Sequence, residues 1–214
     1  MRVLMKSPLL KTSALAVSGL LGLALAANAV SATLQAEAKN ITAHAITSGT
    51  LKITQAKNGV GFDSTIADMA PGDTVNRYVD YSNSGTLASK ALRLKVSDGT
   101  PTILSTDATK GLQLVVTDCS TAWNPTAGTC SGTSTTLLTS ALSNVATDTN
   151  FANITTLAAN GGALHLQFAL TLPNGTNNET VTNGTLPTTT IQGLTAALTW
   201  TLSETQRDGS TTNA

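Results

Sequence analysis

Residues that could do chemistry are few in this chain of 214 residues. It holds two histidines, His44 and His165, and two cysteines, Cys119 and Cys130. The histidines lie far apart and belong to no His-Glu-x-x-His pattern, the helical zinc motif of many metallopeptidases. No Gly-x-Ser-x-Gly elbow is present, and neither cysteine has an obvious base partner. The sequence therefore predicts no catalytic residue, no metal site and no cofactor.

Four aspartates form the only acidic stretch, namely Asp63, Asp68, Asp73 and Asp80. A calcium loop needs oxygen ligands at alternate positions and a closing glutamate, and this spacing does not supply them. We expect these side chains to occupy solvated turn and strand positions. A calcium site assembled from distant loops is the alternative.

The two cysteines enclose a short segment rich in turn-forming residues, Cys119 to Cys130. In an oxidising compartment such a pair is expected to form a disulfide, and closing this loop should add about 3 kcal/mol of stability. Trp123 lies inside the loop. Its expected role is to pack the loop against the domain, and the alternative is an aromatic that binds a ligand.

The composition excludes several classes of protein. There are 12 Lys+Arg and 12 Asp+Glu residues, only 11% of residues are charged and 3% are aromatic, and threonine is the most common residue. No basic excess exists to bind nucleic-acid phosphates. The chain also lacks the strong charge and low hydrophobicity of a disordered protein.

The first 29 residues have the form of a signal peptide. Arg2, Lys6 and Lys11 precede an uncharged stretch, 14–27, whose apolar core is short for a membrane span. Small residues follow, so cleavage is predicted after Ala29, with Ala32 as a second site. An uncleaved membrane anchor is the alternative. Export predicts a secreted protein at the cell surface or in an extracellular matrix, with no membrane contact after cleavage.

The segment that follows the leader has a regular alternation over ten residues. Its apolar residues, which define one face, are Val30, Ala32, Leu34, Ala36 and Ala38. A period of two predicts a β-strand with one buried face. Because chain termini are loose unless something binds them, this face must find a groove in its own domain or in a neighbour.

Further alternating segments predict an all-β fold. Strands are expected at 49–54, 75–81, 92–96, 112–116, 164–170 and 194–202, and a tight Pro-Gly turn at 69–74. The stretch 135–145 has apolar residues three and four apart, which predicts a short amphipathic helix. We expect one antiparallel two-sheet jelly-roll sandwich at 48–214 with one or two short helices, after a leader at 1–29 and an N-terminal segment at 30–47.

Several of these segments resemble the TasA/camelysin (CalY) family of exported proteins. Ser48-Gly-Thr-Leu-Lys-Ile53 is similar to the family's entry strand, and Met69-Ala-Pro-Gly-Asp-Thr74 to its Pro-Gly-Asp turn. Tyr81-Ser-Asn-Ser-Gly-Thr-Leu87 looks like its Asn-x-Gly turn. Leu172-Pro173 and the closing Glu204-Thr-Gln-Arg207 are weaker matches. The resemblance extends over most of the chain after the leader. The chain departs from the family in its cysteine pair, its low charge and the lack of an aromatic residue just after the cleavage point.

The resemblance implies a jelly-roll subunit of extracellular fibres or biofilm matrix. In such fibres each subunit is thought to donate its N-terminal strand to the next, so the implied partner is a second copy in a head-to-tail homopolymer, with other matrix or cell-wall components as further partners. Some family members are labelled metallopeptidases, which here would need His44, His165 and scattered carboxylates. A monomeric adhesin that uses Trp123 and the loop at 173–190 is the remaining alternative.

Overall fold

The computed structural model describes residues 46–154, 156–175 and 177–212. The chain divides into two units, 1–47 and 48–214, and the second holds all the described secondary structure. The predicted leader and the segment Val30–Lys39 lie outside the described residues. The elements, in chain order, are β1 (Ile53–Lys57), β2 (Thr74–Asn83), β3 (Ser89–Asp98), α2 (Ile103–Thr106), β4 (Gln113–Cys119), β5 (Ser134–Ala141), the 3₁₀ helix η1 (Leu142–Val145), β6 (Thr149–Asn150), β7 (Gly162–Thr171) and β8 (Leu198–Gln206).

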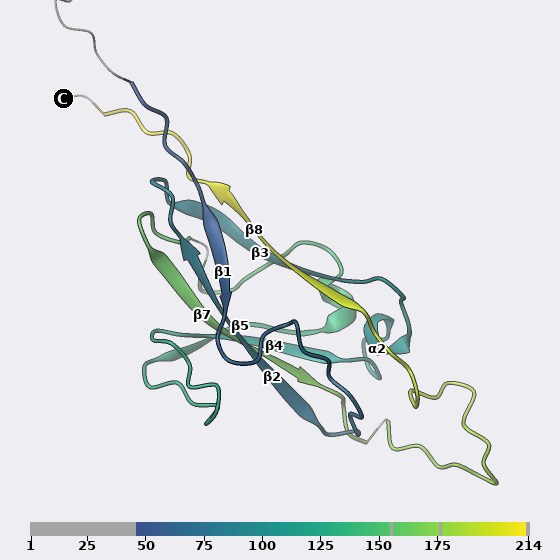
Figure 1. Ribbon diagram of the computed structural model, residues 1–214. Helices are drawn as coiled ribbons and strands as arrows, with labels where there is room; N and C mark the ends of the chain where they lie inside the picture. Colours follow the sequence, from purple (N-terminus) through teal and green to yellow (C-terminus); the bar gives the residue numbers. More distant parts are fainter. Residues whose placement is uncertain (1–45, 155, 176, 213–214) are drawn as a thin grey trace, which may run out of the picture. The chain divides into compact units, whose positions relative to one another are not determined.

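The strands form two antiparallel sheets (Figure 1). The larger sheet has five strands in the order β1-β2-β7-β4-β5, and the smaller has three in the order β6-β3-β8. Every strand pair is antiparallel. The prediction of an all-β, two-sheet antiparallel fold is therefore confirmed. The two sheets differ in size, because β6 contributes only two residues to the smaller one.

The core lies between the sheets and follows the alternation of the sequence. Along β7 the even-numbered residues Leu164, Leu166, Phe168 and Leu170 are buried, and their odd-numbered neighbours are only partly buried or exposed. On β3 of the other sheet, Leu92, Leu94 and Val96 are buried in the same way. Each fully buried leucine contributes roughly 2 kcal/mol of hydrophobic stabilisation, so the two inward faces hold the sandwich together.

The predicted turn before β2 is confirmed. The N–H of Asp73 donates to the carbonyl of Ala70 at 2.9 Å, so Pro71 and Gly72 occupy the two central positions. Proline presets the backbone of the first position, and Gly72 adopts φ +99° at the second, as a type II turn requires. The Asp73 carboxylate also accepts the N–H of Ala70 at 2.7 Å.

The predicted turn after β2 is built around a buried amide. Asn83 is fully buried, its side-chain oxygen accepts the N–H of Gly85 at 2.9 Å, and its side-chain nitrogen donates to the carbonyl of Leu87 at 2.7 Å. The turn also binds the chain before β1, because the N–H of Leu87 donates to Thr50 at 2.8 Å. The strand expected at 49–54 begins only at Ile53, since the preceding residues bond to this turn.

The helix predicted over 135–145 is wrong. Residues Ser134–Ala141 form strand β5, and only Leu142–Val145 turn into a 3₁₀ helix. β5 pairs with the free edge of β4 along its length, with a bulge between Val116 and Thr117. The segment is rich in threonine, whose branched side chain favours strands. Pairing with the edge of β4 therefore stabilised a strand here in spite of the helical spacing of the leucines.

Two smaller differences concern the other helix and the last strand. Helix α2 is a single turn at Ile103–Thr106, which the sequence did not locate. The last strand begins at Leu198 rather than at Leu194. Nowhere in the described chain is there a helix long and apolar enough to cross a membrane.

Candidate assembly groove beside strand β8

The predicted disulfide between Cys119 and Cys130 is present, with Cα atoms 5.8 Å apart. Trp123 folds back beneath this loop and is 8% exposed. Its ring packs on Tyr78 at 5.7 Å between centroids, and its indole N–H donates to the carbonyl of His165 at 2.8 Å. Trp123 therefore anchors the loop to the outer face of the larger sheet, and its ring is not presented to a ligand.

His165 is held by a carboxylate on the neighbouring strand. Its Nδ1 lies 2.7 Å from Oδ1 of Asp80, and its backbone N–H donates to Asp118 at 2.9 Å. Burial raises the pKa of Asp118, and the bonds from His165 offset part of that rise. Within the described ranges, no three His, Cys, Asp or Glu side chains come close enough to hold a metal ion. His44 lies outside those ranges.

The four aspartates expected at turns and strands have separate roles. Asp63 pairs with Lys57 at 2.9 Å, which lowers the pKa of Asp63, while Asp73 closes the Pro-Gly turn and Asp80 holds His165. Asp68 lies in the connection before β2, with φ +53°. The structure disperses them, so they do not form one site.

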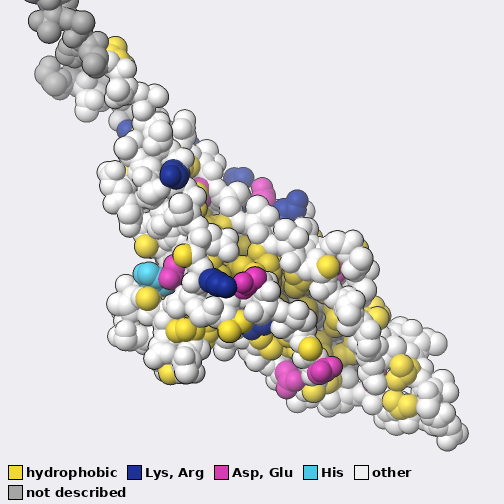
Figure 2. Space-filling view, in the orientation of Figure 1, with side chains coloured by type: hydrophobic (Ala, Val, Ile, Leu, Met, Phe, Trp, Pro, Cys, Tyr) yellow, Lys and Arg dark blue, Asp and Glu magenta, His cyan; other side chains and the backbone are white. Residues whose placement is uncertain are grey.

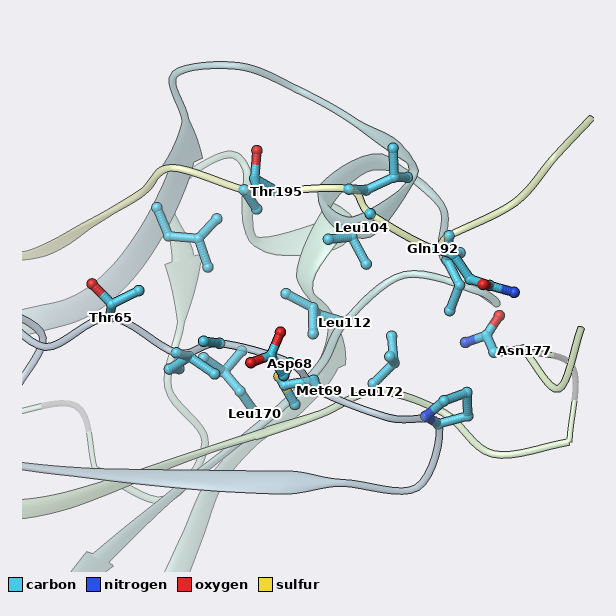
Figure 3. A pocket seen from close by; sticks show the side chains of 18 of the residues that line it. Thr65, Asp68, Met69, Leu104, Leu112, Leu170, Leu172, Asn177, Gln192 and Thr195 are labelled. Carbon is cyan, nitrogen blue, oxygen red and sulfur yellow. The ribbon is translucent and has the colours of Figure 1, made fainter. Parts of the chain in front are cut away.

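A groove of about 990 Å³ lies at one edge of the sandwich. One wall is the connection between β1 and β2, residues 62–71, and the other is the chain leading into β8, residues 191–200. Leu112, Leu170 and Leu172 of the core form its floor, and Figure 3 shows them between Thr65 and Asn177. Figure 2 shows hydrophobic side chains along the middle of this face, below β8. The groove is therefore an opening into the hydrophobic core.

Two lining residues of the groove, Phe62 and Trp200, belong to a cluster of three aromatic rings. Phe62 stacks on Trp200 with ring centroids 4.6 Å apart and an angle of 7° between the ring planes. Phe168 of the opposite sheet meets both rings edge-on, at 4.9 Å from Phe62 and 5.3 Å from Trp200. The connection at 62–71 thus places Phe62 between the two sheets at the edge of β8.

Strand β8 forms the open edge of the smaller sheet. Within the described residues it pairs with β3 alone. Its inward side chains Leu198, Trp200 and Leu202 are only partly buried, although they pack against the core. Across the groove, the backbone N–H groups of residues 64–69 donate no hydrogen bond to any other described residue. The carbonyls of Ser64 and Thr65 accept from Arg77, so the unpaired backbone of this wall is its N–H groups. The outer edge of β8 is the other unpaired backbone that an additional strand could use.

Two buried polar atoms in the groove wall also lack a partner among the described residues. They are Nε of Arg77, which points inward from β2, and Oδ1 of Asn177. Arg77 is 8% exposed and Asn177 is 2% exposed. A buried polar group without a partner costs about 1–3 kcal/mol of stability. A chain that entered the groove could accept a hydrogen bond from Nε of Arg77 and donate one to Oδ1 of Asn177, which would recover part of that cost.

Glu204 continues the inward face of β8 beyond Leu202. Both of its carboxylate oxygens are buried, although the residue as a whole is only partly buried, and the hydroxyl of Ser89 is the group beside them that favours the ionised form. Burial raises the pKa of Glu204, and the Ser89 hydroxyl offsets only part of that rise. An acidic side chain thus occupies an inward position on an edge strand, where a hydrophobic residue is expected.

Sequence reasoning missed the groove, although Asp63 and Asp68, two of the aspartates that it singled out, belong to the groove's lining. The connection at 58–73 showed no periodicity, so nothing indicated that Phe62 would enter the space between the sheets. A signal for Glu204 did exist, because it follows Leu198, Trp200 and Leu202 in the same alternation.

Comparison with known proteins adds no relative: no family model matches this chain, and no curated protein is detectably similar to it in sequence.

Proposed function

We propose that this chain is a secreted structural subunit of extracellular fibres, which polymerises when the N-terminal strand of one copy enters the groove beside β8 of the next. The observation that carries the proposal is the open core at the edge of β8. Added strands gain affinity from backbone hydrogen bonds and specificity from alternate side chains. The resemblance to the TasA/camelysin family supports the same function.

The dimensions of donor and acceptor agree. The alternating segment Val30–Lys39 has ten residues and β8 has nine. Burying Leu34 would contribute roughly 2 kcal/mol and each alanine well under 1 kcal/mol. A narrow strand with mostly alanine on its apolar face suits a space between two sheets that is already partly filled. The backbone ladder along β8 would supply much of the remaining affinity.

The same proposal covers the completed fold, the leader and the geometry of the contact between copies. The missing strand beside β8 would enlarge the smaller sheet and complete a jelly-roll sandwich. Residues 1–29 act as the signal peptide, and the exported chain then has no membrane contact. Because donor and acceptor are different surfaces of one chain, the contact is head-to-tail and propagates without closing.

The test compares two substitutions in the donor segment. Leu34→Asp places a charge on the apolar face and should abolish filaments of the purified secreted protein in negative-stain micrographs. Thr33→Asp, the matched control on the polar face, should assemble like the parent. Deletion of residues 30–39 should leave a folded monomer. Filaments formed by that deletion would show that assembly does not use this strand.

A further inference from the structure

Arg77 is a buried cation that forms no ion pair among the described residues. It faces inward from β2 opposite Phe168 of β7 and is 8% exposed. Its guanidinium donates to carbonyls instead: one terminal nitrogen to Asn76 at 3.1 Å, the other to Ser64 at 3.4 Å and to Thr65 at 3.5 Å. Its Nε–H has no partner in the described chain. Because an unpaired buried donor is costly, Arg77 has capacity for one more acceptor.

Asn177 has the complementary deficiency. It is 2% exposed, and Figure 3 shows it among the side chains that line the groove. Its side-chain nitrogen donates to the carbonyls of Lys110 at 2.8 Å and of Pro173 at 3.1 Å, which fixes the orientation of the amide. Its Oδ1 accepts no hydrogen bond from the described residues. The lining of one groove thus contains an unpaired donor and an unpaired acceptor.

The spacing of these two groups suits an extended chain. Arg77 is level with Phe168, and Asn177 bonds to Pro173, which comes five residues after Phe168. A strand advances roughly 3.3 Å per residue, so an extended segment of about five residues that lies along β7 passes both side chains. A compact molecule beside one of them would leave the other unpaired. A polypeptide offers a carbonyl and an N–H at every residue, so it can satisfy both.

The walls of the groove offer further backbone of the same kind. The outer edge of β8 is unpaired among the described strands. In the opposite wall, Arg77 occupies the carbonyls of Ser64 and Thr65, and the N–H groups of residues 64–69 donate to no described residue. The unpaired backbone next to Arg77 therefore consists of donors, which the carbonyls of an entering chain would satisfy.

The charged side chains of the lining limit which segments fit. Asp63, Asp68 and Glu179 line the groove, together with a single guanidinium. The hydrogen bond from Lys57 lowers the pKa of Asp63, and that from Thr190 lowers the pKa of Glu179, so both carboxylates are ionised at neutral pH. An acidic segment would meet this excess of negative charge, whereas a neutral segment would not.

We propose that the groove recognises the main chain of an extended, non-acidic polypeptide, with the Nε–H of Arg77 donating to one of its carbonyls and Oδ1 of Asn177 accepting one of its N–H groups. The inference rests on the proposed function, since it assigns the recognition groups of the same groove. It goes further in one respect: main-chain groups are common to all sequences, so the groove accepts unrelated segments of small residues and excludes acidic ones. Fibres of this chain can therefore incorporate other proteins that expose such a strand.

The test measures peptide binding by fluorescence polarisation. The protein is the mature chain with Leu34→Asp, which prevents assembly. The probes are two fluorescein-labelled decapeptides, one of alternating threonine and alanine and one with glutamate in place of each alanine. The neutral peptide, whose sequence does not occur in the chain, should bind at least about tenfold more tightly than the acidic one. Equal affinities would overturn the selection against acidic segments.

Arg77→Met in the same background removes the unpaired donor. It should weaken binding of the neutral peptide about tenfold, because a hydrogen bond from a charged group is lost. Arg93→Met, on the exposed face of β3, is the matched control and should not change the affinity. Circular dichroism checks that both variants are folded. Equal affinities of the two variants would overturn the role of Arg77.

An ester scan separates recognition by Asn177 from a structural role. Each peptide of the scan has one amide N–H replaced by an ester oxygen and so lacks one donor. One of these esters should weaken binding severalfold when Asn177 is present and have no effect in Asn177→Leu protein, whereas the others should affect both proteins alike. If no ester distinguished the two proteins, Asn177 would have no part in recognition.

The outcomes also separate this inference from the proposed function. Suppose that the folded protein binds neither decapeptide, while the unmodified mature chain forms filaments that require residues 30–39. Main-chain recognition of unrelated segments would then be overturned, and donor-strand assembly would stand. Binding of the neutral peptide by a chain that forms no filaments would overturn the proposed function and leave the recognition groups in place.

Discussion

The ring of Phe62 lies flat on the indole of Trp200, with 4.6 Å between centroids, and so joins an irregular connection to the edge strand of the smaller sheet. Under the proposed function, a strand of a second copy would be added beside β8 and would pass Trp200. Phe62 would then occupy space that a side chain of that strand needs.

Phe62→Ala should lower the stability of the subunit and speed its assembly. Loss of a partly buried aromatic ring with two aromatic neighbours should cost about 2 kcal/mol in the free energy of unfolding. Denaturant unfolding of assembly-deficient Leu34→Asp protein, with and without the change, measures that cost. Val60→Ala on the same connection is the control, because Val60 is exposed. An unchanged lag time in filament growth would argue that Phe62 does not obstruct the groove.

Removal of the disulfide should destabilise the domain by about 3 kcal/mol, since it releases a 12-residue loop in the unfolded chain. The measurement is denaturant unfolding of the parent and of Cys119→Ser/Cys130→Ser protein, each with and without reductant. The reductant should affect only the parent. Trp123 fluorescence should report the same transition, because the indole is buried under the loop. Equal stability of the two proteins would contradict a structural role for the bridge.

Glu204 should make the unassembled subunit more stable as pH falls. Its folded pKa is raised above the ordinary value of 4.5 by burial, so the folded state binds the proton more tightly than the unfolded state. This contribution is fully present below about pH 4.5 and is lost as pH rises through the folded pKa. The pKa of Asp118 is raised as well, whereas that of Asp63 is lowered, so the informative quantity is the difference in stability between two proteins that differ only at Glu204.

The comparison for that pH effect is the parent against Glu204→Gln, both carrying Leu34→Asp to prevent assembly. At pH 7 the Gln variant should be more stable by about 1 kcal/mol, because a partly buried charge without an opposite charge beside it is gone. The difference should shrink toward pH 4. A stability difference that stays constant between pH 4 and 7 would mean that burial does not perturb Glu204.

Gly85→Ala should disrupt the turn that binds the chain before β1. A Cβ at Gly85 would lie 2.3 Å from the carbonyl oxygen of Thr50 and 2.6 Å from the backbone nitrogen of Lys52, so the backbone must move. We expect the free energy of unfolding to fall by about 2 kcal/mol, which is typical of overpacked sites. Gly209→Ala is the matched control, since nothing lies within 4 Å of its added Cβ. Thermal unfolding should give a lower midpoint for Gly85→Ala than for Gly209→Ala. Equal midpoints for the two variants would contradict the close approach of Gly85 to the backbone of Thr50 and Lys52.

The sequence by itself determined most strands, the Pro71-Gly72 turn and the cysteine bridge. Each of these depends on local chemistry: alternation of side chains along a strand, the backbone preferences of proline and glycine, and the short separation of two cysteines. Tertiary structure determined that residues 134–141 form a strand and not a helix. The free edge of β4 offers them backbone hydrogen bonds, and the local spacing of leucines carries no information about that edge. Tertiary structure also decided the groove, since the position of Phe62 against Trp200 and the surroundings of Glu204 depend on which strands the chain leaves at an edge. Such edges are set by long-range pairing, which no local pattern encodes.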